Sequence, residues 1–480
     1  MSAVLDLADL SLVDAAEAVR KREVSSVALL EACLLELDAH EAQVNATIWV
    51  DREGAYASAR TADAALAAGA APGPLHGLPL AHKDMYYQAG RVSTCGSEIR
   101  RGFVPEVTAT VIARLAGAGA FAFAGLNMAE YAQNGTGHNR HYGDCRNPWN
   151  PPYVTGGSSS GSGAAVAARF TYAALGSDTG GSVRLPASAN GVTGLKPTQT
   201  RVSRYGVMPL SFSADNVGPL TRSARDCARM MSVIAGHDAH DPTSADVAVP
   251  DYEAGLNGDL RGVRVGVPET YFLDGVDPPV LAAFEAALDV LAGRGASLVR
   301  LKLPLMDAVT AYVAVVSRVE SATIHAASMR ERPQDLATHI NARVFTGYAI
   351  PGVYYVEALS RRGPVLRAFA AEVFGQVDVL ASPTIRTCLP TLAETDIDAV
   401  PAGTEALALG ISANTRPFNY LGLPALSVPC GFDPNGLPIG LQLAARPFAE
   451  ALVLRAGDAY QRDTNWHTRR PLSRDTGLER

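Results

Sequence analysis

The sequence lacks the features of several protein classes. No stretch approaches eighteen uninterrupted apolar residues, so no membrane-spanning helix is predicted. The first twenty residues are acidic and have no basic start followed by an apolar run, so they do not read as a signal peptide. The net charge of −7 is spread along the chain without a basic stripe, so nucleic acid is not expected as a direct partner. These absences favour a cytoplasmic protein that binds neither membrane nor nucleic acid.

Cysteine is scarce and scattered. Six cysteines occur in 480 residues, with no C-x-x-C pair and no metal-ligand spacing to a histidine. They are Cys33, Cys95, Cys145, Cys227, Cys388 and Cys430. We therefore expect buried free thiols, and neither a metal nor an organic cofactor is predicted.

Apolar sequence is plentiful, at 48% of residues, which is enough for a large core. A helix-like segment at 111–118 feeds a strand-like segment at 120–125, and strand-like segments return at 260–267 and 377–383. Residues 237–262 are rich in Asp, Pro and Gly and are typical of a surface connection. The alternation predicts an α/β fold.

No internal repeat divides the chain, so a single domain is predicted over residues 1–480. Residues 1–40 read as amphipathic helices that pack on the core. The segment 74–225 holds the motifs described next and is predicted to be the catalytic core.

Residues 145–200 differ in kind from the rest, because two Gly- and Ser-rich tracts flank one short apolar segment. Glycines at 180 and 181 would let successive backbone N–H groups turn inward beside the Ser182 hydroxyl. Such donors stabilise the charge that develops on a carbonyl oxygen during acyl transfer. Ser182 is therefore a candidate nucleophile.

A serine nucleophile needs a base, and none of the ten histidines has a spacing tied to this segment. Lysine can serve instead when burial lowers its pKa enough to hold the amine neutral near pH 7. Lys83 lies in the short segment 80–84, which follows a Gly- and Pro-containing turn.

The chain resembles the amidase signature hydrolases over most of its length. The resemblance rests on motifs at 74–84, 147–150, 156–161, 176–184, 194–197 and 417–431. It implies a large twisted mixed sheet with helices on both faces. It also implies hydrolysis of a linear amide, or of a related carbamate or ester, by an amidohydrolase.

The resemblance assigns the catalytic roles. Ser182 matches the nucleophile, Ser158 the serine that follows a cis peptide bond after Gly157, and Lys83 the base of a proton relay. The implied oxyanion hole uses the N–H groups of Thr179, Gly180 and Gly181. The implied acyl pocket is lined by Ala132, Gln133 and Asn134. A small amide and water are the expected partners, and a homodimer is common in such relatives.

Two neighbours of the nucleophile have a second interpretation. Asp178 and Arg184 could bind a charged substrate, but an internal ion pair that braces the loop is favoured. Farther along, the aromatic residues of 343–369 suggest a lid or pocket wall, with core packing as the alternative.

One alternative is the A subunit of the glutamine-dependent amidotransferase that acts on mischarged tRNA, which shares this catalytic set. Arg362 could match the arginine that holds glutamine in that subunit. Ser412, however, falls where the subunit carries an aspartate, and its characteristic stretch near 315–330 is absent. A free-standing amidase is therefore expected.

Two further alternatives are weaker. Residues 157–161 also match G-x-S-x-G, which would make Ser159 the nucleophile of an α/β-hydrolase-type esterase, but a Pro-rich loop precedes them where a strand is required. A non-enzymatic binding module would not need all three catalytic residues.

Overall fold

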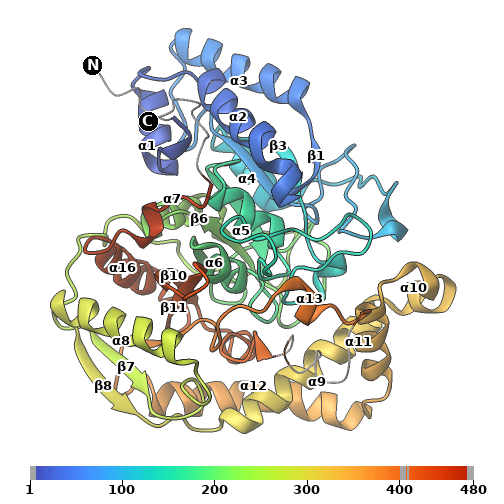
Figure 1. Ribbon diagram of the computed structural model, residues 1–480, viewed down its shortest axis with the longest axis vertical. Helices are drawn as coiled ribbons and strands as arrows, with labels where there is room; N and C mark the ends of the chain where they lie inside the picture. The colour runs from blue at the N-terminus through green and yellow to red at the C-terminus, as the bar shows by residue number, and fades with distance from the viewer. Residues whose placement is uncertain (1–6, 400–406, 408–409, 473–480) are drawn as a thin grey trace.

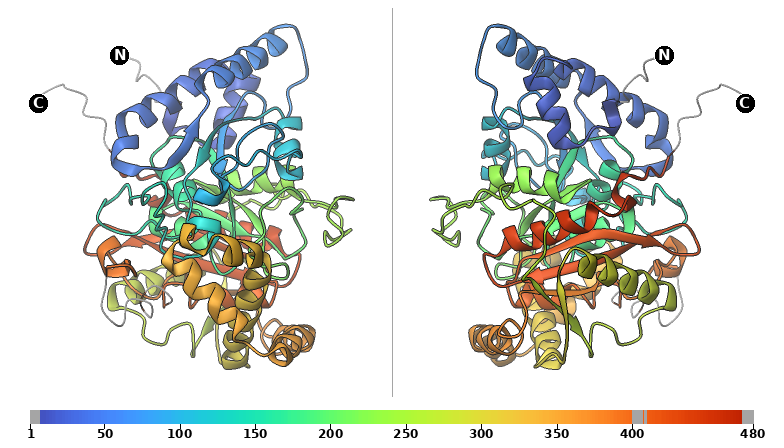
Figure 2. Two further views of the ribbon diagram at one scale, coloured as in Figure 1. Left: turned by 90° about the vertical axis from the view of Figure 1, so that its right-hand side faces the viewer. Right: turned by 90° about the vertical axis from the view of Figure 1, so that its left-hand side faces the viewer.

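The computed structural model describes residues 7–399, 407 and 410–472. Within it the strands form a three-stranded sheet and an eight-stranded sheet. Helices α1, α2 and α3 lie at one end of the molecule, and α9 and α12 lie at the other (Figures 1 and 2). Across the described ranges, no helix is both long and apolar enough to cross a membrane.

The strands are short, and those in the middle of the large sheet are fully buried. Their bounds are β1 (Thr47–Val50), β2 (Pro79–Lys83), β3 (Phe121–Leu126), β4 (Ala173–Ser177), β5 (Thr193–Lys196), β6 (Val217–Thr221), β7 (Arg264–Pro268), β8 (Ser297–Leu301), β9 (Val379–Pro383), β10 (Ala425–Phe432) and β11 (Pro438–Ala445).

The α-helices surround both sheets. Their bounds are α1 (Leu12–Arg20), α2 (Ser26–Val44), α3 (Arg52–Ala67), α4 (Thr110–Gly117), α5 (Ser160–Ala167), α6 (Arg184–Asn190), α7 (Ala224–Ile234), α8 (Pro278–Gly293), α9 (Met306–Ile324), α10 (Ala326–Glu331), α11 (Thr338–Tyr348), α12 (Gly352–Glu372), α13 (Leu392–Thr395), α15 (Arg416–Tyr420) and α16 (Glu450–Gln461). Short 3-10 turns complete the set: η1 (Leu7–Asp9), η2 (Glu98–Arg100), η3 (Glu130–Ala132), η4 (Pro333–Asp335) and η5 (Trp466–Thr468).

The large sheet is mixed, in the order β4-β6-β5-β10-β11-β9-β7-β8. The pairs from β4 to β9 are antiparallel, and β7 pairs in parallel with both β9 and β8. The small sheet, β1-β3-β2, places β2 parallel to β3. Strand β2 also contacts β4, so the two sheets meet where β2 ends at Lys83.

Helices cover both faces of the large sheet. Alternate residues of a strand point to opposite sides, so the contacts of neighbouring residues show which helix lies on each face. A Cβ on Gly457 of α16 would lie 2.5 Å from Leu426 of β10. The next residue, Ser427, pairs with Gly194, where a Cβ would lie 2.7 Å from Ala187 of α6. Helices α16 and α6 thus sandwich β10, and the α/β class with its mixed sheet is confirmed.

The N-terminal helices form as predicted. Ser25 caps α2 by accepting a hydrogen bond from the N–H of Ala28 at 3.0 Å, as a serine does at a helix start. Leu29 and Leu30 of α2 are fully buried in the main core, and α1 contacts α7. These helices are therefore attached to the body that holds β4 to β6.

Other local predictions hold to within a few residues. The expected helix and strand after residue 110 are α4 and β3, and the strands predicted at 260–267 and 377–383 are β7 and β9. Residues 237–262 form no helix or strand. All six cysteines are free, and all but the half-buried Cys388 are buried. The division into one domain stays a prediction.

Candidate active site

Lys83 is the last residue of β2 and is buried between the two sheets. Its Nζ donates hydrogen bonds to Ser158 Oγ at 2.7 Å and to Ser177 Oγ at 2.9 Å. Burial lowers the pKa of Lys83 to about 7, although the charges of Asp178 and Asp215 act in the opposite direction. The neutral amine that a base requires is therefore accessible near neutral pH.

Ser158 follows a cis peptide bond, Gly157–Ser158, as the resemblance implied. The Gly157 N–H donates to Gly135 O at 2.7 Å, and the Ala129 N–H donates to Ser158 O at 3.1 Å. A Cβ at Gly157 would lie 2.7 Å from Gly137 N, so only glycine fits there. These backbone contacts fix the Ser158 hydroxyl beside Lys83.

Ser182 lies in the turn between β4 and α6. An ion pair inside this turn joins Arg184 to Asp178, with both side chains fully buried and 2.9 Å between Nη2 and Oδ1. Burial raises the pKa of Asp178, but the positive charge of Arg184 and its hydrogen bond outweigh this and hold the pKa at about 2. The pair braces the loop and does not face the cavity, as the structural interpretation predicted.

The carboxylate of Asp178 also orders the backbone around the nucleophile. It accepts hydrogen bonds from the Gly181 N–H at 2.8 Å and from the Val183 N–H at 3.2 Å. Gly181 has a φ of +130°, which an L side chain rarely adopts. Because its N–H is used by Asp178, the N–H groups of Thr179, Gly180 and Ser182 are the ones that remain for an oxyanion. The predicted role of Thr179, Gly180 and Gly181 stays a prediction.

A cavity opens at Ser182. Its described lining residues come from six parts of the chain and are Ala132, Gln133, Asn134, Gly135, Thr179, Gly180, Ser182, Leu185, Leu210, Val313, Ser317, Arg343, Ser412 and Arg416. The three residues expected in the acyl pocket, at 132–134, all line it. Their contact with substrate stays a prediction.

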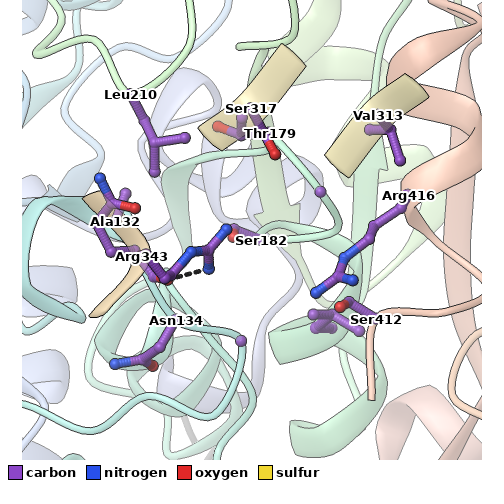
Figure 3. Close-up of a pocket in the computed structure, with 14 residues that line it drawn as sticks. Ala132, Asn134, Thr179, Ser182, Leu210, Val313, Ser317, Arg343, Ser412 and Arg416 are labelled. Carbon is purple, nitrogen blue, oxygen red and sulfur yellow. Dashed lines mark hydrogen bonds between the residues drawn. The ribbon is translucent and has the colours of Figure 1, made fainter. Parts of the chain in front are cut away.

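The lining residues that sequence reasoning missed include two arginines, Arg343 of α11 and Arg416 at the start of α15. Figure 3 draws both guanidinium groups turned toward the interior of the cavity that Ser182 lines. Arg343 donates a hydrogen bond to Gln133 O. No motif marks either arginine, because each is brought to the site by helices more than 150 residues beyond Ser182.

Arg362, the candidate glutamine-binding arginine, has another role. Its guanidinium donates to four acceptors of the protein: Gln199 Oε1 and the carbonyl oxygens of Ser213, Asn419 and Tyr420. It does not line the cavity at Ser182, whereas Ser412 does. Arg362 therefore ties α12 to the end of α15 and to the loops that carry Gln199 and Ser213.

The geometry does not support Ser159 as nucleophile. Ser159 Oγ both donates to Ser177 O and accepts from Ser177 N, each at 3.3 Å. The residues before α5 form a loop and not the strand that an α/β-hydrolase elbow needs. Ser159 thus connects α5 to β4.

The lid or pocket wall suggested at 343–369 stays a prediction, and its core-packing alternative holds for part of the segment. Phe345, Tyr348 and Tyr354 are more than half exposed, and none of them lines the cavity at Ser182. Leu359, in contrast, packs against a buried cluster that includes Val365 and Phe369.

Comparisons with known proteins extend these observations. The family model "Amidase" matches residues 28–454. The A subunit of glutamyl-tRNA(Gln) amidotransferase from Chloroflexus aggregans is 43% identical, over 94% of this chain and 95% of that protein. The protein of the same name from Thermotoga maritima has a solved structure with a TM-score of 0.80 and 30% identity, covering 96% of both chains.

Another solved structure matches this one with a TM-score of 0.88 and 33% sequence identity, and the match covers 94% of this chain and 98% of that chain. It is described as an unexpected vestigial protein complex that reveals the evolutionary origins of an s-triazine catabolic enzyme. The near-complete coverage means that the resemblance extends well beyond the catalytic motifs.

The comparisons correct one expectation. We expected from the sequence a free-standing amidase rather than the A subunit of the amidotransferase. That prediction is wrong, because curated relatives 38–43% identical over nearly the whole chain carry the name of the A subunit. The differences at Ser412 and at 315–330 concern short stretches, and they weigh less than identity over the full length. The chain belongs to the amidase family and is an amidohydrolase.

Proposed function

We propose that the chain hydrolyses a carboxamide through an acyl-enzyme on Ser182, as the glutamine-hydrolysing A subunit of an amidotransferase. The observation that carries the chemistry is the contact between the buried Lys83 and Ser158, 2.7 Å apart. The role within an amidotransferase rests on the name of the relatives that are 38–43% identical.

The relay begins when neutral Lys83 takes the proton of Ser158 while Ser158 takes the proton of Ser182. In the part of the chain that the structure describes, the Ser182 hydroxyl has no hydrogen-bond partner, so its contact with Ser158 would form as substrate enters. The alkoxide attacks the carbonyl carbon. The N–H groups of Thr179, Gly180 and Ser182 then stabilise the oxyanion of the tetrahedral intermediate.

The second half returns the protons. The protonated relay donates to the leaving nitrogen, the C–N bond breaks, and ammonia departs from a primary amide. Water then gives its proton to the same relay and attacks the acyl-enzyme, which releases the acid and restores the Ser182 hydroxyl.

The test is an ammonia-release and hydrolysis panel of glutamine, benzamide, an acetanilide, an aryl carbamate and a nitrophenyl ester. It is run on the wild type and on Ser182→Ala, each alone and with co-purified partner subunits. We expect turnover of glutamine by the wild type only, increased by the partners. Turnover of another amide but not of glutamine would remove the role within an amidotransferase. An active Ser182→Ala would overturn the nucleophile.

A further inference from the structure

The cavity at Ser182 has a strong bias of charge. Among its fourteen described lining residues, two are arginines, Arg343 and Arg416, and none is acidic. A third arginine, Arg318 of α9, joins both of them in lining an adjoining cavity. The site is therefore suited to an anion and opposed to a cation.

Arg416 is fixed next to the backbone that would hold the oxyanion. A Cβ built on Gly180 would lie 3.5 Å from Arg416 Cγ and 4.0 Å from its Nε. The preceding residue, Thr415, donates from Oγ1 to Gly180 O at 2.6 Å. A group bound by the guanidinium of Arg416 thus lies within one small molecule's length of Ser182.

Among the residues that the structure describes, no acidic side chain forms an ion pair with the guanidinium of Arg416, and no group forms a hydrogen bond with it. Burial, together with the positive charge of Arg318, lowers the pKa of Arg416 to about 10, so the group is still charged at pH 7. Burying a charged guanidinium without a counter-ion destabilises the fold, and a bound anionic ligand would supply that counter-ion.

Arg362 provides the contrast, since its donors are used by four acceptors of the protein. A substrate carboxylate would have to displace these contacts. Arg343 and Arg416 come from different helices and turn their guanidinium groups toward the same cavity (Figure 3). Charge-assisted bonds from two guanidinium groups are a strong arrangement for a carboxylate.

We propose that Arg343 and Arg416 hold the carboxylate of the substrate, and that the substrate class is the ω-monoamides of dicarboxylic acids without a required α-ammonium group. This rests on the proposed function and names its substrate class. We expect no requirement for an α-ammonium group, because the described lining supplies no acidic side chain to pair with one. Glutaramate, which is glutamine without its amino group, should be bound at least as well as glutamine.

The test measures binding separately from chemistry. Calorimetric titrations use the Ser182→Ala variant with glutaramate, with glutamine and with glutaramide, an uncharged isostere of glutaramate. We expect glutaramate to bind about 10- to 100-fold more tightly than glutaramide, the range for hydrogen bonds to a charged group. Equal affinity for the two compounds, or no detectable binding of glutaramate, would overturn the proposal.

Variants in the same background locate the subsite. Arg416→Gln should remove most of the preference for glutaramate over glutaramide, and Arg343→Gln should weaken it. Arg416→Lys keeps the charge and should keep part of the preference, which covers the case in which Arg416→Gln does not fold. Arg361→Gln changes an exposed arginine on α12 and should bind as the parent does. A preference that survives both Arg416→Gln and Arg343→Gln overturns the proposal.

The two proposals fail separately. If the wild type releases no ammonia from any carboxamide while glutaramate binds in an Arg416-dependent way, the proposed function fails and the subsite stands. If glutamine is hydrolysed but Arg416→Gln does not alter the preference for the carboxylate, the proposed function stands and the carboxylate subsite fails.

Discussion

The Nζ atom of Lys83 lies 2.7 Å from the Oγ atom of Ser158, 75 residues farther along the chain, and the contact joins the end of β2 to the loop before α5. Burial lowers the pKa of this lysine to about 7. The catalytic predictions follow from this contact and from the turn that carries Ser182.

The first prediction concerns the dependence of rate on pH. Because the relay needs the neutral amine of Lys83, kcat/KM should rise about tenfold per pH unit below pH 7 and level off above it. In Lys83→Arg the side chain stays protonated, so kcat should fall by about 10²- to 10⁴-fold and kcat/KM should no longer increase with pH. Initial rates between pH 5 and 9 measure this. A wild-type profile that is flat through pH 7 contradicts a lysine base.

The second prediction concerns stability. The unfolded chain binds a proton on Lys83 up to its ordinary pKa of 10.5, but the folded chain releases it at about 7. Between these values the unfolded state holds more protons, so the free energy of unfolding rises with pH, and below pH 7 the full cost of burial remains.

Lys196 is also buried, with a pKa of about 7, and contributes in the same way. Lys83→Met should therefore lower the slope of the unfolding free energy against pH by about 1 kcal/mol per unit in this window. Urea titrations at pH 7, 8 and 9 give the slope. Lys196→Met should have the same effect on the slope, so an unchanged slope in Lys83→Met alone contradicts the assignment.

The third prediction distinguishes the serines. Ser182→Ala should reduce kcat on the order of 10⁵- to 10⁶-fold, since the covalent step is lost. Ser159→Ala removes only contacts to the Ser177 backbone and should stay within about tenfold of the wild type. Acyl-enzyme trapping by mass spectrometry should label Ser182. Label on Ser159 would revive the esterase interpretation.

The fourth prediction concerns the buried pair under the nucleophile. Arg184→Met leaves the fully buried Asp178 carboxylate without its cation, so about 3–5 kcal/mol of unfolding free energy should be lost. Arg264, whose ion pair with Asp378 is partly exposed, is the control, and Arg264→Gln should cost far less stability, because water already screens that pair. Chemical denaturation compares them, and equal losses would contradict the argument.

The fifth prediction concerns the turn itself. Gly181→Ala would place a Cβ 2.2 Å from Thr415 Oγ1 at a φ of +130°, so we expect a loss of about 1–3 kcal/mol in stability together with a loss of activity. Gly102→Ala has open space and ordinary backbone angles and should be close to neutral. Thermal unfolding and kcat/KM check both variants, and a fully active Gly181→Ala would contradict the strict need for glycine.

Motifs predicted local backbone features such as the cis bond before Ser158, while the catalytic roles of these loops stay predictions. A glycine such as Gly181 is required by its own backbone angle, and Ser158 by its place after Gly157, so both can be read from neighbouring residues. Lys83 could be found by resemblance, but its lowered pKa depends on burial between sheets that only the fold creates.

The specificity side of the cavity could not be predicted in this way. Arg416 looks like an ordinary helix-start residue, and its meaning comes from the packing of its stem against Gly180, 236 positions earlier. Arg362 looked like a ligand residue, yet backbone carbonyls fill its donors. Long side chains contact partners that are far away in the sequence, and no local pattern specifies those partners. The sequence therefore gives the positions of these arginines but not the directions in which their side chains point.

The meeting of the two sheets has a consequence for inactivation. His82, next to Lys83, accepts a hydrogen bond at Nδ1 from the Leu175 N–H at 3.2 Å, and burial lowers its pKa to about 3, so the contact is neutral. This contact between β2 and β4 fixes the position of the proposed base, Lys83, relative to the turn that carries the proposed nucleophile, Ser182. A sub-global opening that parts the small sheet from the large one would silence the enzyme while most helices remain folded. Under the proposed mechanism, loss of activity would therefore report the separation of the small sheet from the large sheet before the helices unfold.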